Sequence, residues 1–329
     1  MNSGSTSTQT SSLMWILCGA LVVALVLSML VAPGGLGVGG DAEARALILR
    51  EVRLPRTLLG GFVGAALGLA GASLQGYLRN PLAEPGVIGV SGGAAFGAVM
   101  VIHLGLASAV PLALPLAGLS GAALSTILVV GLAGVNSGPV PLLLAGVAVA
   151  SMMAALIALV LNLAGNPFAA AESVFWMMGS LTDRSLMQAA LAIPLMVLGM
   201  AMLLRLGAAL DALTLGEETA ASLGIDLVAA RRLMVAGIAL SVGAATAVTG
   251  IIGFVGLVVP HLMRRFVGHQ PSRLLPASAL AGAVLLLVAD ALLRLVSPWL
   301  DIRIGVLTAV LGAPFFVWLV VAMRRELTP

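Results

Sequence analysis

The sequence contains no lysine, and this absence excludes one class of protein. All 16 basic side chains are arginine. A Walker A loop needs a lysine that reaches the phosphates of the bound nucleotide, so this chain cannot hold a standard P-loop. Any ATP hydrolysis linked to this protein must therefore take place in another polypeptide.

Residues that bind metals or carry out covalent catalysis are also scarce. Cys18 is the single cysteine, which excludes an intrachain disulfide and a cysteine-based metal site. The three histidines His103, His261 and His269 are far apart in the sequence and lack the spacing of metal ligands. No nucleophile, base and oxyanion set stands out. We therefore expect no metal, no cofactor and no enzymatic activity in this chain.

Charged residues make up 9% of the chain and hydrophobic residues 60%. This composition indicates an all-α, polytopic membrane protein. The net charge of +3 does not indicate nucleic acid as a partner, because the arginines lie between the hydrophobic runs and form no basic stripe. Membrane lipid is the expected surrounding.

The hydrophobic runs predict about ten transmembrane helices. The predicted spans are Leu13–Ala32, Thr57–Leu78, Gly86–Leu106, Pro111 to Val135, Leu142–Leu163, Leu186–Leu206, two segments within Leu233–Met263, Ala277–Val296 and Gly305–Met323. The uncharged run Leu233–Met263 has 31 residues, too many for one upright span and too few for two, so we predict one full and one short, bent span. Residues 1–12, rich in Ser and Thr, are predicted as a disordered cytoplasmic tail, and residues 13–329 as one transmembrane domain.

The arginines support ten spans and an orientation. With a cytoplasmic N-terminus, ten spans place nine arginines inside and seven outside, whereas one span fewer leaves six inside and ten outside. Cytoplasmic loops carry the excess of basic residues, so ten spans are favoured. Both termini are then expected on the cytoplasmic side of a bacterial inner membrane.

The segment 207–230 is a polar stretch between Arg205 and Arg231 in an otherwise hydrophobic chain. Thr214 and Glu217 have the spacing of a capping box, Gly224 suits a left-handed turn, and Asp226 can cap the next helix. The pattern predicts two helices joined by a corner, the second of which runs through Arg231 and Arg232 into the membrane. The first, a short amphipathic helix held outside the bilayer, could dock into a partner's groove. An interfacial loop that lies on lipid headgroups explains the pattern equally well.

Two further features concern charge near the outer side. Arg45, Arg50, Arg53 and Arg56 lie in a predicted outer loop, against the positive-inside tendency, and either pair with an acidic external partner or are balanced by nearby acids. Asp290 is the acid placed deepest in a span. We expect a local ion pair between Asp290 and Arg294, with Arg294 reaching the outer surface.

Several motifs together resemble the FecCD-type permease family. They are RLPR at 53–56, RNPLAEPG at 79–86, GVSG at 89–92, LGE at 215–217, LG at 223–224, GFVGLVVPH at 253–261 and GVLTAVLGAP at 305–314. They occur in the family's order across nearly the whole chain. Members of this family are membrane subunits of ABC importers for ferric siderophores, haem and cobalamin.

The resemblance implies a type II ABC importer permease architecture, a homodimer, two cytoplasmic ABC ATPases that bind ATP, and an extracytoplasmic substrate-binding protein. The implied ATPase-coupling residues are Leu215, Gly216, Glu217, Glu218, Ala221, Leu223, Gly224 and Asp226. The implied residues for docking of the binding protein are Arg53, Arg56 and Arg294. Met152, Met153 and Leu156 are candidates for the translocation path, although no motif fixes them.

The sequence therefore predicts an ATP-driven importer permease for a metal chelate, most simply a ferric siderophore. The main alternative is a secondary transporter driven by an ion gradient, which would need buried, paired acids near the membrane midplane. Asp290 is the one acid that the sequence offers for that role.

Overall fold

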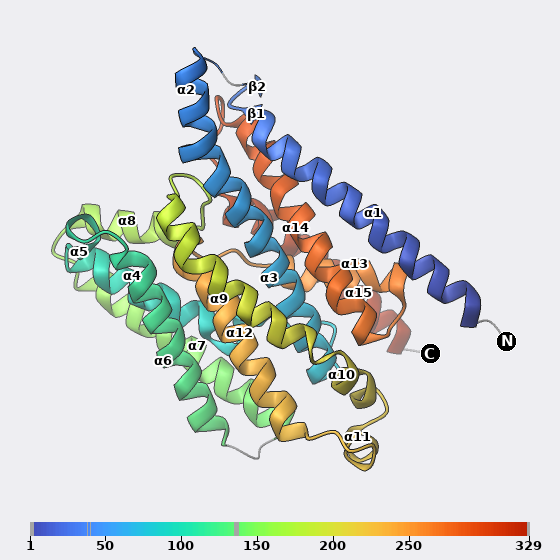
Figure 1. Cartoon of the computed structure of the whole chain (residues 1–329). Helices are drawn as coiled ribbons and strands as arrows, with labels where there is room; N and C mark the ends of the chain where they lie inside the picture. The colour runs from blue at the N-terminus through green and yellow to red at the C-terminus, as the bar shows by residue number, and fades with distance from the viewer. Residues whose placement is uncertain (1–2, 38, 40, 135–137, 328–329) are drawn as a thin grey trace.

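The computed structural model describes residues 3–37, 39, 41–134 and 138–327, and it is a bundle of long helices (Figure 1). The elements in chain order are α1 (Ser3–Leu30), β1 (Val31–Ala32), β2 (Gly35–Leu36), α2 (Ala42–Leu47), η1 (Ile48–Arg53), α3 (Leu54–Leu78), η2 (Pro85–Ile88), α4 (Val90–His103), α5 (Leu106–Ala109), α6 (Ala113–Ala133), α7 (Pro139–Asn162), α8 (Pro167–Met177), α9 (Leu186–Leu204), α10 (Gly207–Leu213), α11 (Glu217–Ser222), α12 (Leu227–Thr249), α13 (Val255–Val267), α14 (Pro271–Val296) and α15 (Ile304–Leu327). The helix α2 lies at one end of the bundle and α11 at the other, and we name these the α2 end and the α11 end.

The number of long helices agrees with the predicted spans. Within the described residues, eight helices are long and apolar enough to cross a membrane. The helices α4 and α13 have 14 and 13 residues. At about 1.5 Å per residue they are shorter than a hydrocarbon core of about 30 Å. The chain is a multi-pass membrane protein, and about ten passes result when these two short helices are included.

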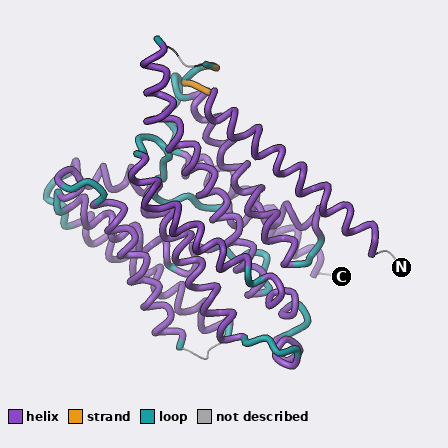
Figure 2. The backbone as a smooth tube through the Cα atoms, in the orientation of Figure 1, coloured by secondary structure: helices purple, strands orange, loops and turns teal. Residues whose placement is uncertain are grey.

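The split of the uncharged run 233–263 is confirmed. The helix α12 ends at Thr249, and α13 begins at Val255. The segments 79–89 and 250–254 precede the short helices α4 and α13. They enter the bundle from opposite ends, where α3 and α12 end. Figure 2 shows loop segments in the middle of the helical bundle. The two segments meet there, where the Phe254 backbone N–H donates a hydrogen bond to Oε1 of Glu84 at 2.5 Å.

The helix α3 occupies the centre of the bundle, where it packs against α14, α13, α12 and α9. Its contacts are made through glycines. A Cβ on Gly64 would overlap the carbonyl oxygen of Gly282 in α14, and a Cβ on Gly71 would overlap that of Gly256 in α13. Small residues of this kind let helix backbones approach closely inside a membrane.

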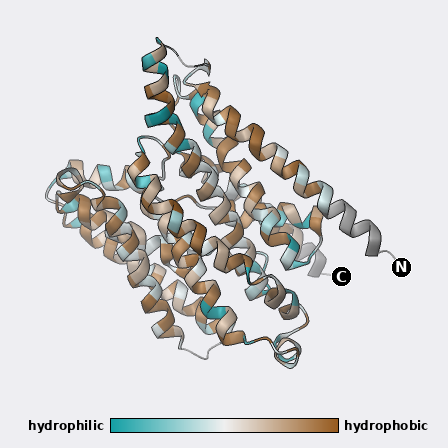
Figure 3. Cartoon of the chain, in the orientation of Figure 1, coloured by the Kyte–Doolittle hydropathy of each residue, from teal (hydrophilic) through white to brown (hydrophobic). Residues whose placement is uncertain are grey.

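The outer faces of the bundle are apolar. Figure 3 shows hydrophobic colour along the outward faces of the long helices. Trp15 of α1, Ile127 of α6, Leu144 of α7 and Val310 of α15 are more than 60% exposed in the isolated chain. Such surface is stable only against lipid or another subunit.

The prediction of a loop over residues 33–56 is wrong. The strands β1 and β2 form a short antiparallel hairpin, and a helix begins at Ala42 and continues through η1 into α3. Asp41 starts this helix, because its Oδ1 accepts a hydrogen bond from the Ala44 backbone N–H at 2.8 Å. The four arginines of this region therefore lie on one continuous helical segment rather than on a loop.

Other predicted boundaries also differ from the structure. The predicted loop from Ala164 to Ser185 contains helix α8, which begins after Asn166, whose side chain caps Phe168. The segment 1–12 is helical from Ser3 onward, since α1 begins there. The predicted end of span four at Val135 lies outside the described residues, and α6 ends at Ala133.

The close contact between α3 and α14 predicts the effect of one added methyl group. We expect Gly64→Ala to lower the free energy of unfolding by about 1–3 kcal/mol, because the new Cβ overlaps backbone atoms that cannot turn away. Thermal or denaturant unfolding of the detergent-solubilised chain measures this change. Gly131→Ala in α6 is the control, because nothing lies within 4 Å of a Cβ there. Equal stability of the two variants would contradict the packing argument.

Candidate functional site

The polar segment 207–230 forms a compact projection at the α11 end. It contains α10 as well as α11, so it has one helix more than predicted. Leu215 and Leu223 flank α11 and are 65% and 62% exposed, while Ala220 between them is fully buried. Between these two exposed leucines, α11 itself carries exposed polar residues such as Glu218 and Thr219. The two leucines form an apolar contact site on a projection held outside the apolar bundle.

The caps of this segment are partly as predicted. Asp226 accepts hydrogen bonds from the backbone N–H groups of Val228 and Ala229, each at 2.9 Å, and Gly224 has the left-handed φ of +85°. The predicted capping box at Thr214 is wrong. Thr214 ends α10 and donates its hydroxyl to the carbonyl of Asp211 at 2.6 Å. Gly216, with φ +105°, occupies the cap of α11 instead.

The projection is tied to the bundle by polar contacts. Asp211 of α10 accepts hydrogen bonds from the Ser272 backbone N–H at 2.8 Å and from Nε2 of Gln270 at 3.1 Å, at the start of α14. Glu217 of α11 lies 4.0 Å from the guanidinium of Arg79, just after α3. Displacement of α11 would therefore act on both α14 and α3.

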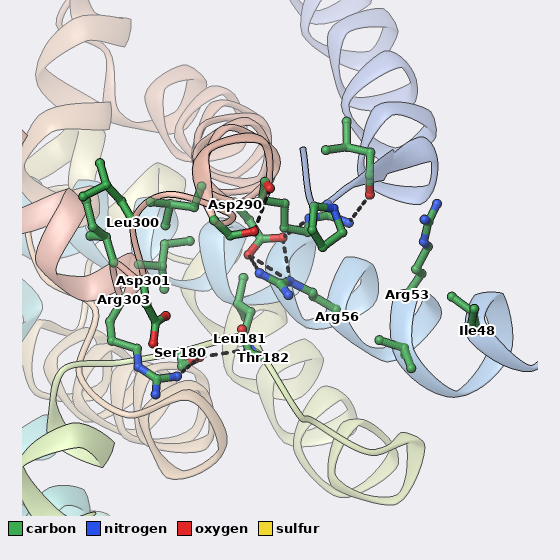
Figure 4. A pocket seen from close by; sticks show the side chains of 18 residues that line it. Ile48, Arg53, Arg56, Ser180, Leu181, Thr182, Asp290, Leu300, Asp301 and Arg303 are labelled. Atoms are coloured by element: carbon green, nitrogen blue, oxygen red, sulfur yellow. Dashed lines mark hydrogen bonds and ion pairs between the residues drawn. The ribbon is translucent and has the colours of Figure 1, made fainter. Parts of the chain in front are cut away.

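A pocket of about 300 Å³ lies at the α2 end, and Figure 4 shows its lining. The segments around it come from η1 and α3, from the loop before α9, and from the end of α14 with the loop that follows. Asp290 of α14 is 2% exposed and lies at the centre. In Figure 4 the guanidinium of Arg56 points toward Asp290, while Arg53 points away from this pair.

Asp290 forms two ion pairs. Nε and Nη2 of Arg56 donate to its carboxylate oxygens at 2.9–3.1 Å, which is a bidentate contact between α3 and α14. The predicted pair with Arg294 is confirmed, since Nε of Arg294 lies 3.2 Å from Oδ2. Both guanidinium groups are more than four-fifths buried. The expectation that Arg294 reaches the outer surface is wrong.

Arg294 and Arg53 point into the bundle because α1 and the hairpin segment that follows it offer them acceptors. Nη1 of Arg294 donates to the carbonyls of Ser28 and Val31, at 2.8 and 3.1 Å. Arg53 donates to the carbonyls of Met29 and Gly37. These arginines therefore fasten the end of α1 to α14 and η1. These contacts do not test the role in docking the binding protein that the motifs imply for Arg53 and Arg294, and that role stays a prediction.

Two other arginines at the α2 end are exposed to the outside of the chain. Arg45 and Arg50 are exposed on α2 and η1, and Nε of Arg50 lies 3.5 Å from Glu51. Beside the pocket, Arg184 donates to the Ser180 carbonyl at 3.3 Å. Burial lowers the pKa of Arg184, and the neighbouring Asp183 opposes that shift. Among the described residues, the pocket itself is lined by four arginines, Arg53, Arg56, Arg294 and Arg303, and by two carboxylates, Asp290 and Asp301.

A second polar cluster, which the sequence analysis did not single out, lies where the segments 79–89 and 250–254 meet. We call Gln75, Glu84, Phe254 and Arg264 the loop junction. Nε2 of Gln75 donates to the carbonyls of Ala83 and Gly256, both at 3.2 Å, and Oε1 of Gln75 accepts from Nη2 of Arg264 at 2.7 Å. Glu84 caps the first residues of α13 through the Phe254 N–H.

Glu84 is half-buried at this junction. A signal in the sequence existed, because Glu84 is an acid inside the motif RNPLAEPG and the motif GFVGLVVPH follows a glycine break. What the sequence could not indicate is that these two motifs, about 170 residues apart, touch each other.

The three path candidates in α7 are not equivalent. Met153 is 2% exposed and packs beside Gly92 of α4, whereas Met152 is 40% exposed. Leu156 is partly buried against the core. Within α7, Met152 is therefore the one of the three that presents most of its side chain outside the chain.

Comparisons with known proteins agree with this architecture. The model of the FecCD transport family matches residues 11–322. The chain belongs to the FecCD transport family. It is 42% identical to the Fe(3+) dicitrate transport system permease protein FecD of Escherichia coli (strain K12) over 279 residues, which cover 84% of this chain and 86% of that protein.

Two further FecCD relatives support the same assignment. The chain is 38% identical to the vitamin B12 import system permease protein BtuC of Vibrio cholerae over 274 residues, 82% of each chain. A solved structure described as an inward-facing metal-chelate type ABC transporter has a TM-score of 0.86 and 32% identity, and the match covers 95% of this chain and 99% of that one. The FecCD fold thus extends over nearly the whole protein, which is a transport permease subunit.

The Asp290 ion pairs predict a large loss of stability when the carboxylate is neutralised. We expect Asp290→Asn to cost about 3–5 kcal/mol, because Arg56 and Arg294 would both remain buried without a counter-charge. Unfolding of the solubilised chain measures the loss. Glu51→Gln is the control, since an exposed pair contributes about 0–1 kcal/mol. A small effect at Asp290 would show that water or another group compensates the arginines.

The loop junction predicts a local change in backbone protection. We expect Glu84→Ala to speed hydrogen exchange in residues 250–257 about fivefold to hundredfold, because the Phe254 N–H loses its acceptor. Glu84→Gln retains an acceptor oxygen and should differ little from the parent chain. Glu172→Ala on the exposed face of α8 serves as the control. Unchanged exchange in Glu84→Ala would refute the capping role.

Proposed function

We propose that the chain is the transmembrane subunit of an ATP-driven importer in the bacterial inner membrane, and that it moves a metal chelate into the cell. The observation that carries this proposal is the projection with exposed Leu215 and Leu223 on a bundle that belongs to the FecCD family. The chain lacks lysine, so ATP would be bound and hydrolysed by two separate ATPase subunits.

In this proposal the α11 end faces the cytoplasm. Leu215, Leu223 and the acidic first turn of α11 insert into a groove of the ATPase. The ATPase-coupling set is the one that the motifs indicate, from Leu215 to Asp226. Closure of the ATPase dimer displaces α11. The contact of Glu217 with Arg79 transmits that displacement to α3, and the contact of Asp211 in α10 with Ser272 transmits it to α14.

The α2 end then faces outward and receives the substrate-binding protein. Arg53, Arg56 and Arg294 stay the motif-based candidates for this contact, and the exposed Arg45 and Arg50 lie on the same helical segment. An acidic partner that reaches the pocket would meet a lining with more cations than anions. A second copy of this chain completes the translocation path, with Met152 among the side chains that face it.

The substrate in this proposal is a ferric siderophore or a related iron chelate. The 42% identity to a ferric dicitrate permease supports iron, and the 38% identity to a vitamin B12 permease keeps cobalamin as an outcome of the test. Uptake of radiolabelled iron chelates, haem and cobalamin by proteoliposomes with the complete complex distinguishes them. Uptake of cobalamin but of no iron chelate would overturn the assignment of an iron chelate as substrate.

The alternative function, a secondary transporter driven by an ion gradient, would need Asp290 as a proton carrier. The contacts of Asp290 disfavour that role. A proton carrier must release and regain its proton during transport, but this carboxylate is held by two guanidinium groups. Glu84 is a second acid inside the bundle, and it is bound to the Phe254 N–H, where it caps a helix.

The coupling role predicts a loss of ATPase binding. We expect Leu223→Asp to reduce the ATPase that co-purifies with the tagged chain at least about tenfold, because a carboxylate would be buried in the apolar groove. Leu36→Asp is the matched control, since Leu36 is 75% exposed at the opposite end. Mass spectrometry of a mild-detergent pull-down gives the measurement. Full retention of the ATPase by Leu223→Asp would exclude α11 as the coupling element.

A further inference from the structure

A pocket at the α11 end has a cationic lining that the coupling role does not use. It has a volume of about 590 Å³ and lies between the ends of α3, α13 and α15 and the start of α14. Its basic side chains come from two segments that are far apart in the sequence. They are Arg79, His261, Arg264, Arg265 and His269, and no carboxylate lines the pocket within the described part of the chain.

The charges of this pocket are poorly compensated by the protein itself. Arg264 is half-buried and donates to Oε1 of Gln75, which is a neutral amide. Arg79 has a carboxylate only at 4.0 Å, from Glu217. Among the described residues, Arg264 and Arg265 have no carboxylate within the 4.0 Å limit of an ion pair. A cation that is partly removed from water, as Arg264 is, favours an anion beside it.

The pocket lining also contains the aromatic ring of His261 and the apolar residues Leu274 and Met323. His261 meets Phe315 and Trp318 edge-on, with ring centroids 5.6 and 6.3 Å apart. Its Nδ1 is buried and has no hydrogen-bond partner among the described residues. A ligand with an oxyanion group and a less polar remainder fits this combination of lining groups.

We propose that this pocket binds an oxyanion group, the phosphate of an anionic phospholipid or the carboxylates of a soluble chelator. The same helix α13 presents Leu262 and Met263 to an apolar groove of about 300 Å³, which Leu285 and Val288 of α14 also line. An acyl chain in that groove places a headgroup near Arg265, which follows these residues by one turn. Basic pockets between helices at the end of a membrane domain are typical binding sites of anionic headgroups.

The test uses the full-length chain, purified in mild detergent and stripped of lipid. One arm adds phosphatidylglycerol or phosphatidylcholine and counts retained lipid by native mass spectrometry. The other arm titrates citrate and inorganic phosphate and follows thermal stability. Binding in the first arm identifies a lipid phosphate, and binding in the second identifies a soluble anion.

The decisive variant is the double substitution Arg264→Gln and Arg265→Gln. We expect it to weaken retention of phosphatidylglycerol, or the response to citrate, at least about tenfold. Arg232→Gln is the matched control, because Arg232 is an exposed arginine of α12 that does not line the pocket. The control should bind as the parent chain does.

A failure to fold is separated from a failure to bind by single variants at exposed positions. Arg265→Gln and His269→Gln leave no buried partner behind and should each weaken binding by a smaller factor. The proposal is overturned when neither anion binds above the level of the double variant, or when Arg232→Gln loses as much as that variant. The assay contains no transport step, so its result does not depend on the proposed importer function.

Discussion

The backbone contact of α3 with α14 and α13 is the constraint on which the rest of the structure depends. Inside a membrane, lipid is as apolar as a leucine side chain, so helices are held together by close packing rather than by the hydrophobic effect. Gly64 and Gly71 leave no side chain between the backbones at the points of contact. The two ends of α3 then carry polar groups, Arg56 at one end and Gln75 at the other, which set the helix against its neighbours in one position.

The two polar clusters solve the problem of polar groups in an apolar bundle in different ways. At the α2 end one carboxylate, Asp290, pairs with both Arg56 and Arg294, and the carbonyls of Ser28 and Val31 accept from Nη1 of Arg294. At the loop junction the groups are satisfied mainly by backbone, since Gln75 and Glu84 bond to carbonyl and N–H groups that the short helices leave free. The first cluster fixes helices side by side. The second joins two non-helical segments that enter the bundle from opposite ends. Backbone without helical hydrogen bonds needs such partners at this depth in a membrane protein.

Much of the architecture could be predicted from the sequence, because the length of hydrophobic runs and the placement of arginines follow directly from the thickness and polarity of a membrane. The split of the run 233–263 and the cap at Asp226 are examples. Side-chain direction could not be predicted in the same way. Arg294 was expected at the surface, but it turns inward because α1, more than 260 residues earlier, offers it carbonyl groups. The loop junction could not be predicted for the same reason, since neither of its two local motifs indicates that it contacts the other.

The geometry also limits how a movement at α11 can travel. The projection contacts the bundle at Arg79, which directly follows α3, and at the start of α14, where Asp211 caps Ser272. Four residues before Arg79, Gln75 holds both the segment after α3 and the start of α13. Because α3 and α14 touch through backbone atoms, they cannot slide past each other without a clash, so a push at α11 displaces them together. Segments 79–89 and 250–254 have close backbone contacts of their own, because a Cβ on Gly146 of α7 would overlap the carbonyl oxygen of Val87 and a Cβ on Gly179 that of Ile251. A push at α11 that moves these segments therefore also reaches α7 and the loop before α9.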